Sequence, residues 1–299
     1  MTPRKLAFAV YRVLRNTARA SGQMGLIRRL GGPFVGRLLY KISPGGTGPV
    51  QLHGHSMYLA SSGSFPPLDM AMARYEPGTT MLFSEIIKPG MVVVDVGAHV
   101  GYFTLLAANK VGPTGKIYAF EPDQNNHALL LKNIEMNGYD NVVATQMAVS
   151  NRKGTSVLYL TALDSGRHSM YHHGLPERGS IAIETTTLDS FFSSEGSDRA
   201  DLIKVDVEGA EVSVLDGMTS LIEEWADLKL IIEFNPALLQ GSGGTPLTFL
   251  EKLVSQNWEI QIIEETIGLS PLGKGDDAQA LTDRLLDSGT SVNLFCTRP

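Results

Sequence analysis

The most distinctive chemical pattern in the sequence joins an acid to two glycines at the end of an apolar run, Val92-Val93-Val94-Asp95-Val96-Gly97-Ala98-His99-Val100-Gly101. Asp95, Gly97 and Gly101 have the spacing D-x-G-x-x-x-G. Glycine in a tight turn lets the backbone approach a ligand closely. The dinucleotide fingerprint has a different spacing, G-x-G-x-x-G. An acid ahead of the first glycine favours a cationic ligand over a pyrophosphate.

A second acid, Glu121, follows the predicted strand Lys116–Phe120. A carboxylate at this strand end can accept hydrogen bonds from both hydroxyls of a ribose. Met147 and Ala148 end the third predicted strand, where we expect an adenine to lie against backbone and thioether. Together these positions predict a site for S-adenosylmethionine. The alternative is that the two glycines are ordinary turn residues and that Glu121 only begins a helix.

A second pattern contains four ionisable residues: Lys204, Asp206, Glu208 and Glu211. Side chains alternate along a strand, so Lys204 and Asp206 of the predicted strand Leu202–Val207 and Glu208, directly after it, are expected to share one face. Buried charges are costly unless they are paired, and an ammonium between carboxylates keeps all three charged. Glu211 falls in the first turn of the next helix, where a carboxylate complements the helix dipole, and is a candidate contact for a substrate.

Methyl transfer to oxygen needs an acceptor hydroxyl in line with the methyl group and a route for its proton. We expect Lys204, Asp206 and Glu208 to border the transfer site, with Asp206, aided by Lys204, as the base. Glu233 and Asn235 end the next predicted strand. With Asp206 they form a candidate all-oxygen site for a divalent cation such as Mg²⁺. The alternative to both functions is a structural charge cluster.

These residues require a scaffold that brings strand ends together. From Thr79 onward, apolar strands alternate with helices, which is typical of a mainly parallel sheet covered on both faces. Ligands bind at the carboxyl ends of the strands in such sheets. The predicted strands are Met91–Val96, Lys116–Phe120, Val142–Met147, Leu202–Val207, Leu228–Phe234, Glu259–Ile263 and Val292–Thr297.

A histidine-rich loop, Ser165–Gly179, separates two further predicted strands, Ser156–Thr161 and Ile181–Thr187. Its glycines and proline argue against a helix and therefore against a helical metal site. His168 and Ser169 are candidates for lining an acceptor pocket. The alternative is that the histidines of this loop are simply exposed.

The motifs together resemble those of FkbM-type S-adenosylmethionine-dependent methyltransferases over about residues 76–235. The resemblance implies a class I, Rossmann-like fold with a seven-stranded, mostly parallel sheet whose last strand is antiparallel. It also implies O-methylation of a sugar, a glycolipid or a sugar- or polyketide-derived natural product. The matching segments are Tyr75-Glu76-Pro77 with Thr80, Lys88-Pro89-Gly90, Val94–Tyr102, Phe120-Glu121-Pro122, Asn133, Asn137, Thr187-Leu188-Asp189 and Ile203–Glu211.

The matched positions add expected cofactor contacts at Ala98, His99 and Pro122. The resemblance implies that Glu76 and Thr80 close over the cofactor, whereas capping or packing of a helix is the alternative. His99 stands where the family more often has asparagine, which affects only the detailed contact at that position.

The charge of the chain is unevenly distributed. Of the 25 basic residues, nine precede Asp69, and all 31 acidic residues lie from Asp69 onward. Arg4 to Arg19 has the pattern of an amphipathic helix. We therefore expect a basic helical extension with its linker at 1–49, a hairpin and lead-in at 50–78, and the methyltransferase domain at 79–299. The extension either packs on the body or on a second subunit, or lies on an anionic membrane. Nucleic acid is disfavoured, because the basic residues lack interleaved stacking aromatics.

Other counts exclude several classes. A single cysteine, Cys296, rules out an internal disulfide framework and a cysteine-based zinc cluster. It favours a cytoplasmic, reducing setting, with contact at the inner face of a membrane left open. No run approaches the roughly 18 apolar residues of a spanning helix. Two other functions remain alternatives, a nicotinamide-dependent oxidoreductase and a noncatalytic protein that binds a membrane or a partner through a methyltransferase scaffold.

Overall fold

A computed structural model describes residues 48–59, 70, 75–162, 164–196, 199–265, 268–273 and 275–298. Of the extension and linker predicted at 1–49, residues 1–47 lie outside this part of the chain. Within the described residues, no helix is both long and apolar enough to cross a membrane.

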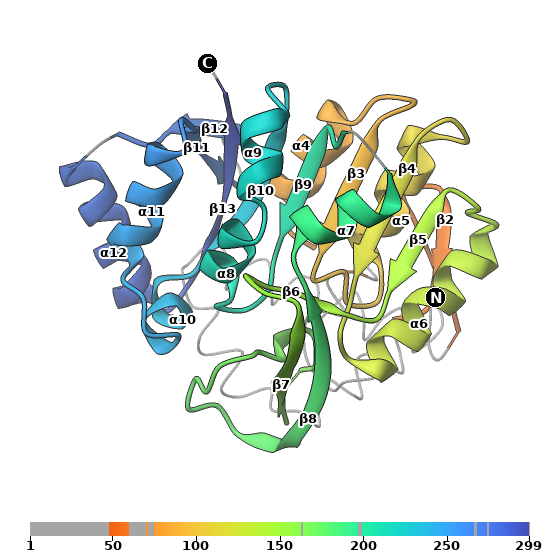
Figure 1. Ribbon diagram of the computed structural model, residues 1–299, viewed down its shortest axis with the longest axis horizontal. Coiled ribbons are helices and arrows are strands. Elements are labelled where there is room, and N and C mark those ends of the chain that lie inside the picture. Colours follow the sequence, from red (N-terminus) through yellow and green to blue (C-terminus); the bar gives the residue numbers. More distant parts are fainter. Residues whose placement is uncertain are drawn as a thin grey trace, which may run out of the picture.

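The centre of the molecule is a twisted eight-stranded sheet (Figure 1). Counted from one edge, the first five strands of the sheet are parallel to one another. The last strand of the chain lies between two strands that precede it in sequence and is antiparallel to both. This order and these directions confirm the predicted fold class and the antiparallel last strand. In spatial order the strands are β5 (Val142–Thr145), β4 (Lys116–Phe120), β3 (Val92–Val96), β9 (Leu202–Val205), β10 (Lys229–Phe234), β13 (Val292–Thr297), β11 (Glu259–Glu264) and β12 (Gly268–Pro271).

Two hydrophobic clusters cover the two faces of this sheet. Alternate residues of the strands from β5 to β11 enter opposite clusters, so that in β3 Val94 and Val96 pack on one face and Val93 on the other. This alternation follows from strand geometry and explains why the strands are apolar throughout. The helices are α4 (Pro77–Ile86), α5 (Tyr102–Val111), α6 (Gln124–Asn137), α7 (Leu188–Glu195), α8 (Glu211–Asp216), α9 (Thr219–Glu224), α10 (Pro236–Gly241), α11 (Pro246–Ser255) and α12 (Asp276–Ser288).

The sheet departs from the prediction at three places. β12 adds an eighth strand, because the chain after β11 folds back and pairs antiparallel with it. β5 ends at Thr145 rather than at Met147, because the chain leaves the edge of the main sheet there. β9 ends at Val205, so Asp206 and Glu208 lie in the following turn and not on a strand face.

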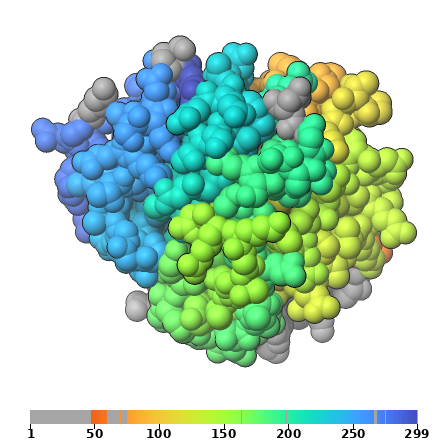
Figure 2. Space-filling model, viewed as in Figure 1, coloured from red at the N-terminus to blue at the C-terminus, as the bar shows by residue number. Residues whose placement is uncertain are grey.

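A second, three-stranded sheet stands beside the ends of the main strands. It contains β6 (Ala148–Val149), β7 (Gly154–Thr161) and β8 (Glu177–Thr186), and a short 3-10 helix, η1 (Ser165–Arg167), follows β7. β7 and β8 project away from the main sheet (Figure 1), and Figure 2 shows the same residues as a lobe at the lower end of the molecule. We call residues 148–186 the cap.

The predicted hairpin is present as β1 (Val50–Leu52) and β2 (His55–Met57). Two asparagines of α6 hold it. The side-chain oxygen of Asn137 accepts from the Ser56 amide at 2.8 Å, and that of Asn133 accepts from the Tyr58 amide at 2.7 Å. A side-chain amide can both accept and donate, so Asn133 and Asn137 can hydrogen-bond the backbone of this segment as a neighbouring strand would. The boundary between the lead-in and the domain stays a prediction.

Candidate active site

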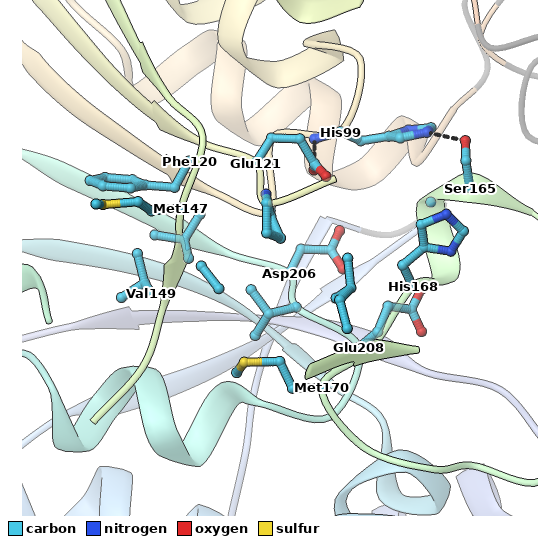
Figure 3. Close-up of a pocket in the computed structure, with 17 residues that line it drawn as sticks. His99, Phe120, Glu121, Met147, Val149, Ser165, His168, Met170, Asp206 and Glu208 are labelled. Atoms are coloured by element: carbon cyan, nitrogen blue, oxygen red, sulfur yellow. Dashed lines mark hydrogen bonds between the residues drawn. The ribbon is translucent and has the colours of Figure 1, made fainter. Parts of the chain in front are cut away.

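One pocket lies between the carboxyl ends of β3, β4 and β9 and the cap (Figure 3). Its position agrees with the rule that ligands bind at the carboxyl ends of parallel strands. Nine predicted site residues line it: Gly97, His99, Glu121, Pro122, Met147, Ala148, His168, Asp206 and Glu208.

The glycine turn after β3 is shaped by close backbone contacts. Gly97 has φ of 86°, and a Cβ there would collide with the carbonyl oxygen of Asp206. The amides of Gly97 and Ala98 both donate to the Phe120 carbonyl, at 3.0 and 2.9 Å. Gly101, with φ of 97°, begins α5 and lies against Leu130. Gly97 therefore borders the pocket, whereas Ala98 and Gly101 build the turn from outside its lining.

Glu121 is the best-placed group for a ribose. Its two oxygens accept from the amides of His99 and Asp123, each at 2.9 Å, so the carboxylate is fixed in orientation. The oxygen that accepts from Asp123 also accepts from the Asn126 side-chain amide at 3.4 Å, so the oxygen that accepts from His99 is the one with a lone pair left for a ligand hydroxyl. Burial raises the pKa of Glu121 to about 7, against the effect of these hydrogen bonds. Phe120, Met147 and Val149 form an apolar wall on the neighbouring side of the pocket (Figure 3).

Asp95 lies beneath the pocket rather than in it. It is 1% exposed, and its carboxylate accepts from the Thr104 hydroxyl at 2.6 Å. Burial raises its pKa, while the neighbouring Lys204 and the Thr104 hydrogen bond act in the opposite direction. Asp95 and Lys204 are also register partners on β3 and β9. Asp95 therefore lies beside Lys204 and interacts with it electrostatically. A direct cofactor contact at Asp95 stays a prediction.

Lys204 is the buried cation of the site. It is 2% exposed, its ammonium lies 2.8 Å from the Asp206 carboxylate, and the Phe103 ring is 4.5 Å below it. Burial alone would lower the pKa of this ammonium, but three carboxylates outweigh burial and raise it, those of Asp206, Glu76 and Asp95. The predicted pairing of Lys204 with Asp206 is confirmed. The expectation that Glu208 shares this ammonium and stays charged is wrong, because the other carboxylates acting on Lys204 are those of Glu76 and Asp95. A proton-accepting role for Lys204 is not supported, because the ammonium stays protonated; it instead holds Asp206.

Asp206 and Glu208 differ in environment although they are neighbours. Asp206 carries the ion pair with Lys204. Glu208 adopts a left-handed backbone conformation, with φ of 52°. Burial, together with the nearby Asp206 charge, raises the pKa of Glu208 to about 8. Two carboxyl groups with such different environments are suited to opposite proton roles, with Asp206 as acceptor and Glu208 as holder of a proton.

Glu76 and Thr80 lie outside the pocket lining. Glu76 begins α4 with φ of 40° and accepts from the Asn293 side-chain amide at 2.9 Å. The Thr80 hydroxyl donates to the Tyr75 carbonyl at 2.9 Å. Burial raises the pKa of Glu76 to about 7, and the Lys204 ammonium lowers it in part. Glu76 thus acts electrostatically on Lys204, and closure of Glu76 and Thr80 over a cofactor stays a prediction.

The structure does not support the candidate cation site. Among the described residues, no three histidine, cysteine, aspartate or glutamate side chains are arranged to hold a metal ion. Asn235 instead caps α10, where its side-chain oxygen accepts from the Leu238 amide. Glu233 and Asn235 both lie outside the pocket lining. The prediction of a Mg²⁺ site at this strand end is therefore left without support.

The three candidate substrate residues separate in the structure. His168 lines the pocket, and burial lowers its pKa to about 4, so its ring is neutral. It is only 9% exposed, so the expectation of an exposed histidine is wrong here. Ser169 lies behind the lining and donates to the Glu208 carbonyl at 2.6 Å. Glu211 is fully buried and accepts from the Gly209 amide, which makes it a support for the turn.

The cap contributes lining residues that the sequence reasoning missed. They are Val149, Leu158, Ser165, Gly166 and Met170. The ring of His99 lies 2.9 Å from the Ser165 hydroxyl, so the histidine at this position joins the glycine turn to the cap (Figure 3). The irregular loop between two predicted strands was the available indication, because loops that border strand ends commonly carry site residues.

Comparison with known proteins places these features in a family. The model of the methyltransferase FkbM domain matches residues 95–253. Methyltransferase sdnD of Sordaria araneosa is 28% identical over 169 residues, covering 47% of this chain and 64% of the relative. Hexuronic acid methyltransferase AglP of Haloferax volcanii is 25% identical over 150 residues, covering 50% and 59%. 2-O-methyltransferase NoeI of Sinorhizobium fredii is 28% identical over 150 residues, covering 46% and 60%. The chain thus spans less than two thirds of the length of these three relatives.

Solved structures with similar folds are more distant. An S-adenosylmethionine-dependent O-methyltransferase from Thermotoga maritima has 15% identity and a TM-score of 0.39, with 74% of this chain and 65% of that chain covered. An rRNA methylase from Streptococcus thermophilus has 11% identity and a TM-score of 0.42, with 74% and 93% covered. The family model covers more than half of the sequence, including both the glycine turn and the segment from Lys204 to Glu211, and the chain therefore belongs to the FkbM methyltransferase domain family.

Proposed function

We propose that this chain is an S-adenosylmethionine-dependent O-methyltransferase that acts on a hydroxyl of a sugar, a glycolipid or a sugar- or polyketide-derived natural product. The observation that carries the proposal is the convergence of Glu121, Gly97 and Asp206 on one pocket. The names of AglP and NoeI, which refer to a hexuronic acid and to 2-O-methylation, support oxygen as the acceptor atom and a sugar as its carrier.

The residues present fit the cofactor. Glu121 offers a fixed carboxylate for the ribose hydroxyls, and the wall of Phe120, Met147 and Val149 suits an adenine. Gly97 keeps the turn open beside this pocket, because a side chain there has no room. When bound, S-adenosylmethionine supplies an electrophilic methyl group on a positively charged sulfur.

The residues of the chain then have separable tasks. Asp206 takes the proton that the acceptor hydroxyl gives up as its oxygen forms the new bond to carbon. Lys204 holds Asp206 in place through the 2.8 Å ion pair. Glu208, with its raised pKa, keeps a proton at neutral pH and can donate a hydrogen bond to the acceptor. Positioning of the acceptor supplies most of the rate enhancement that such a site needs.

A two-part experiment tests the proposal. Thermal-shift assays compare S-adenosylhomocysteine with NAD, and we expect only the former to stabilise the protein, by an amount that grows with the logarithm of its concentration over its Kd. Label transfer from methyl-labelled S-adenosylmethionine is then measured on methyl glucoside, methyl galactoside, methyl mannoside, methyl rhamnoside and methyl glucuronide. Stabilisation by NAD alone would overturn the proposal in favour of an oxidoreductase. Binding of S-adenosylhomocysteine without transfer to any acceptor of this panel would count against a sugar hydroxyl.

Cofactor affinity is expected to rise with pH because of Glu121. The ribose hydroxyls donate hydrogen bonds, so they favour the charged carboxylate. With a pKa of about 7, Glu121 is mostly protonated at pH 6 and mostly charged at pH 8. The competent fraction and hence the affinity for S-adenosylhomocysteine should increase about tenfold over this interval. Isothermal titration calorimetry at several pH values measures it.

The matched variant for this prediction is Glu121→Gln. It removes the titrating group, so its affinity should be weaker at pH 8 and should lose most of the pH dependence. A pH dependence of the same size in this variant and in the wild type would show that Glu121 does not control binding.

A further inference from the structure

His173 lies where the cap meets the turn after β9. Its Nε2 atom is 3.0 Å from the Glu208 carbonyl oxygen and 2.9 Å from the Ser169 hydroxyl. Ser169 itself donates to the same carbonyl at 2.6 Å. Because a carbonyl only accepts, Nε2 carries the proton, and the ring contributes a second donor to this one oxygen.

The ring of His173 fits a space that two glycines leave. A Cβ at Gly209 would lie 2.9 Å from the ring, and a Cβ at Gly241 would lie 2.5 Å from Nδ1. Gly209 belongs to the turn after β9, and Gly241 is the last residue of α10. The Nδ1 atom is buried and has no hydrogen-bond partner in the described part of the chain. The ring is therefore wedged between two elements and fixed through Nε2.

The carbonyl that His173 holds belongs to a strained residue. A non-glycine residue in the left-handed region persists only where its surroundings hold it, and Glu208 has φ of 52°. The Glu208 side chain lines the pocket, whereas His173 does not. An effect of His173 on the reaction must therefore pass through the position of Glu208 or through the cap.

We propose that His173 is a positioning residue, which pins the cap to the Glu208 backbone and so fixes the acceptor side of the site. The inference rests on the proposed methyl transfer. On the cofactor side, Glu121 is held by the amides of His99 and Asp123 and not by His173.

The test compares His173→Ala, His173→Gln and the control His172→Ala. His172 is the neighbouring loop histidine, its side chain 64% exposed and paired with Glu177. Label transfer is followed on the glycoside of the panel that the wild type methylates fastest. Misplaced reacting groups commonly cost on the order of 100-fold in rate, so His173→Ala should lower kcat/KM about 10- to 100-fold. The Kd for S-adenosylhomocysteine should not change, and His173→Gln, which keeps a donor of similar reach, should recover most of the loss.

A second pair of variants tests the wedge without touching the histidine. Gly241→Ala should displace the ring and reproduce the defect of His173→Ala. Gly244→Ala is the control, since the nearest atom to its added Cβ would be a carbonyl oxygen at 3.5 Å, an ordinary contact. Equal activity in wild type, His173→Ala and Gly241→Ala would overturn the inference. So would a loss in His173→Ala that is matched by weaker S-adenosylhomocysteine binding, since that would mean a general structural defect.

Hydrogen exchange keeps the inference separate from the proposed function. The amides of Val207 and Gly209 donate to the Glu211 side chain within the turn that His173 holds. His173→Ala and Gly241→Ala should speed exchange at these amides, and the controls should not. If the wild type methylates no acceptor but exchange at these amides becomes faster in the two variants, the proposed function is wrong and the positioning role of His173 is supported. If the wild type transfers methyl but neither exchange nor kcat/KM changes in His173→Ala and Gly241→Ala, only the positioning role of His173 is wrong.

Discussion

Replacing Asp206 with asparagine is expected to abolish methyl transfer while the protein still binds S-adenosylhomocysteine. Asparagine preserves the shape of the side chain and can still accept a hydrogen bond from Lys204. It cannot take the proton of an acceptor hydroxyl. General bases contribute about 10²- to 10⁴-fold to rates, and we expect kcat to fall by that order. Single-turnover transfer and calorimetric binding, measured on the same preparation, separate the two effects.

The control for this substitution is Asp216→Asn. Asp216 is also an aspartate paired with a lysine, Lys252, but it lies on the surface with 40% of its side chain exposed. This variant should retain wild-type transfer. If Asp206→Asn transferred methyl as fast as Asp216→Asn, then Asp206 would not be the base.

The second large effect is expected on stability. Lys204→Met removes the ammonium that compensates the carboxylates of Asp206, Glu76 and Asp95. Removing one member of a buried ion pair typically costs about 3–5 kcal/mol, because the partner charge remains uncompensated. We expect a loss of that size in the free energy of unfolding near neutral pH, measured by urea denaturation.

The pH dependence of this loss has a definite sign. The pKa of Lys204 is raised in the folded protein, so its contribution is fully present below the unfolded pKa of about 10.4 and disappears only above it. Acidification should reduce the penalty in Lys204→Met, because the carboxylates left behind become neutral. Lys252→Met removes the exposed pair with Asp216 and should change stability by about 1 kcal/mol or less. Equal losses in the two methionine variants would show that Lys204 compensates no buried charge.

The sequence was sufficient to predict those features of the fold and the site that depend on local sequence patterns and general rules. β4 and β13 have the predicted bounds, Lys116–Phe120 and Val292–Thr297, because short segments rich in β-branched and aromatic residues favour a strand. The pairing of Lys204 with Asp206 was also predictable, since a buried ammonium needs a carboxylate nearby. The positions of Glu121 and Gly97 followed from the strand-end rule for parallel sheets.

Other features depend on contacts that a linear pattern does not contain. Alternation along Leu202–Val207 placed Glu208 on a strand face, but the strand ends at Val205 and the next residues form a turn. The fixation of this turn by His173 depends on Gly241, which is far away in the sequence. Likewise, Asn235 was a candidate metal ligand by type, and only the start of α10 shows that its oxygen is engaged as a cap.

The cap is the part of the site that sequence reasoning describes least. Its strands β7 and β8 were expected, but not their position against the pocket. That position depends on tertiary contacts such as the one between His99 and Ser165. The role of the basic extension predicted at 1–49 stays a prediction.

The most direct test of the account is the fate of an isotopically labelled methyl group. The protein is incubated with S-adenosylmethionine labelled in its methyl carbon and with each glycoside of the panel, and carbon NMR follows the label from sulfur to its product. The account predicts an O-methyl resonance on a sugar with the wild type and none with Asp206→Asn. An O-methyl resonance of equal intensity with Asp206→Asn, or label that remains on sulfur throughout while S-adenosylhomocysteine binds, would contradict it.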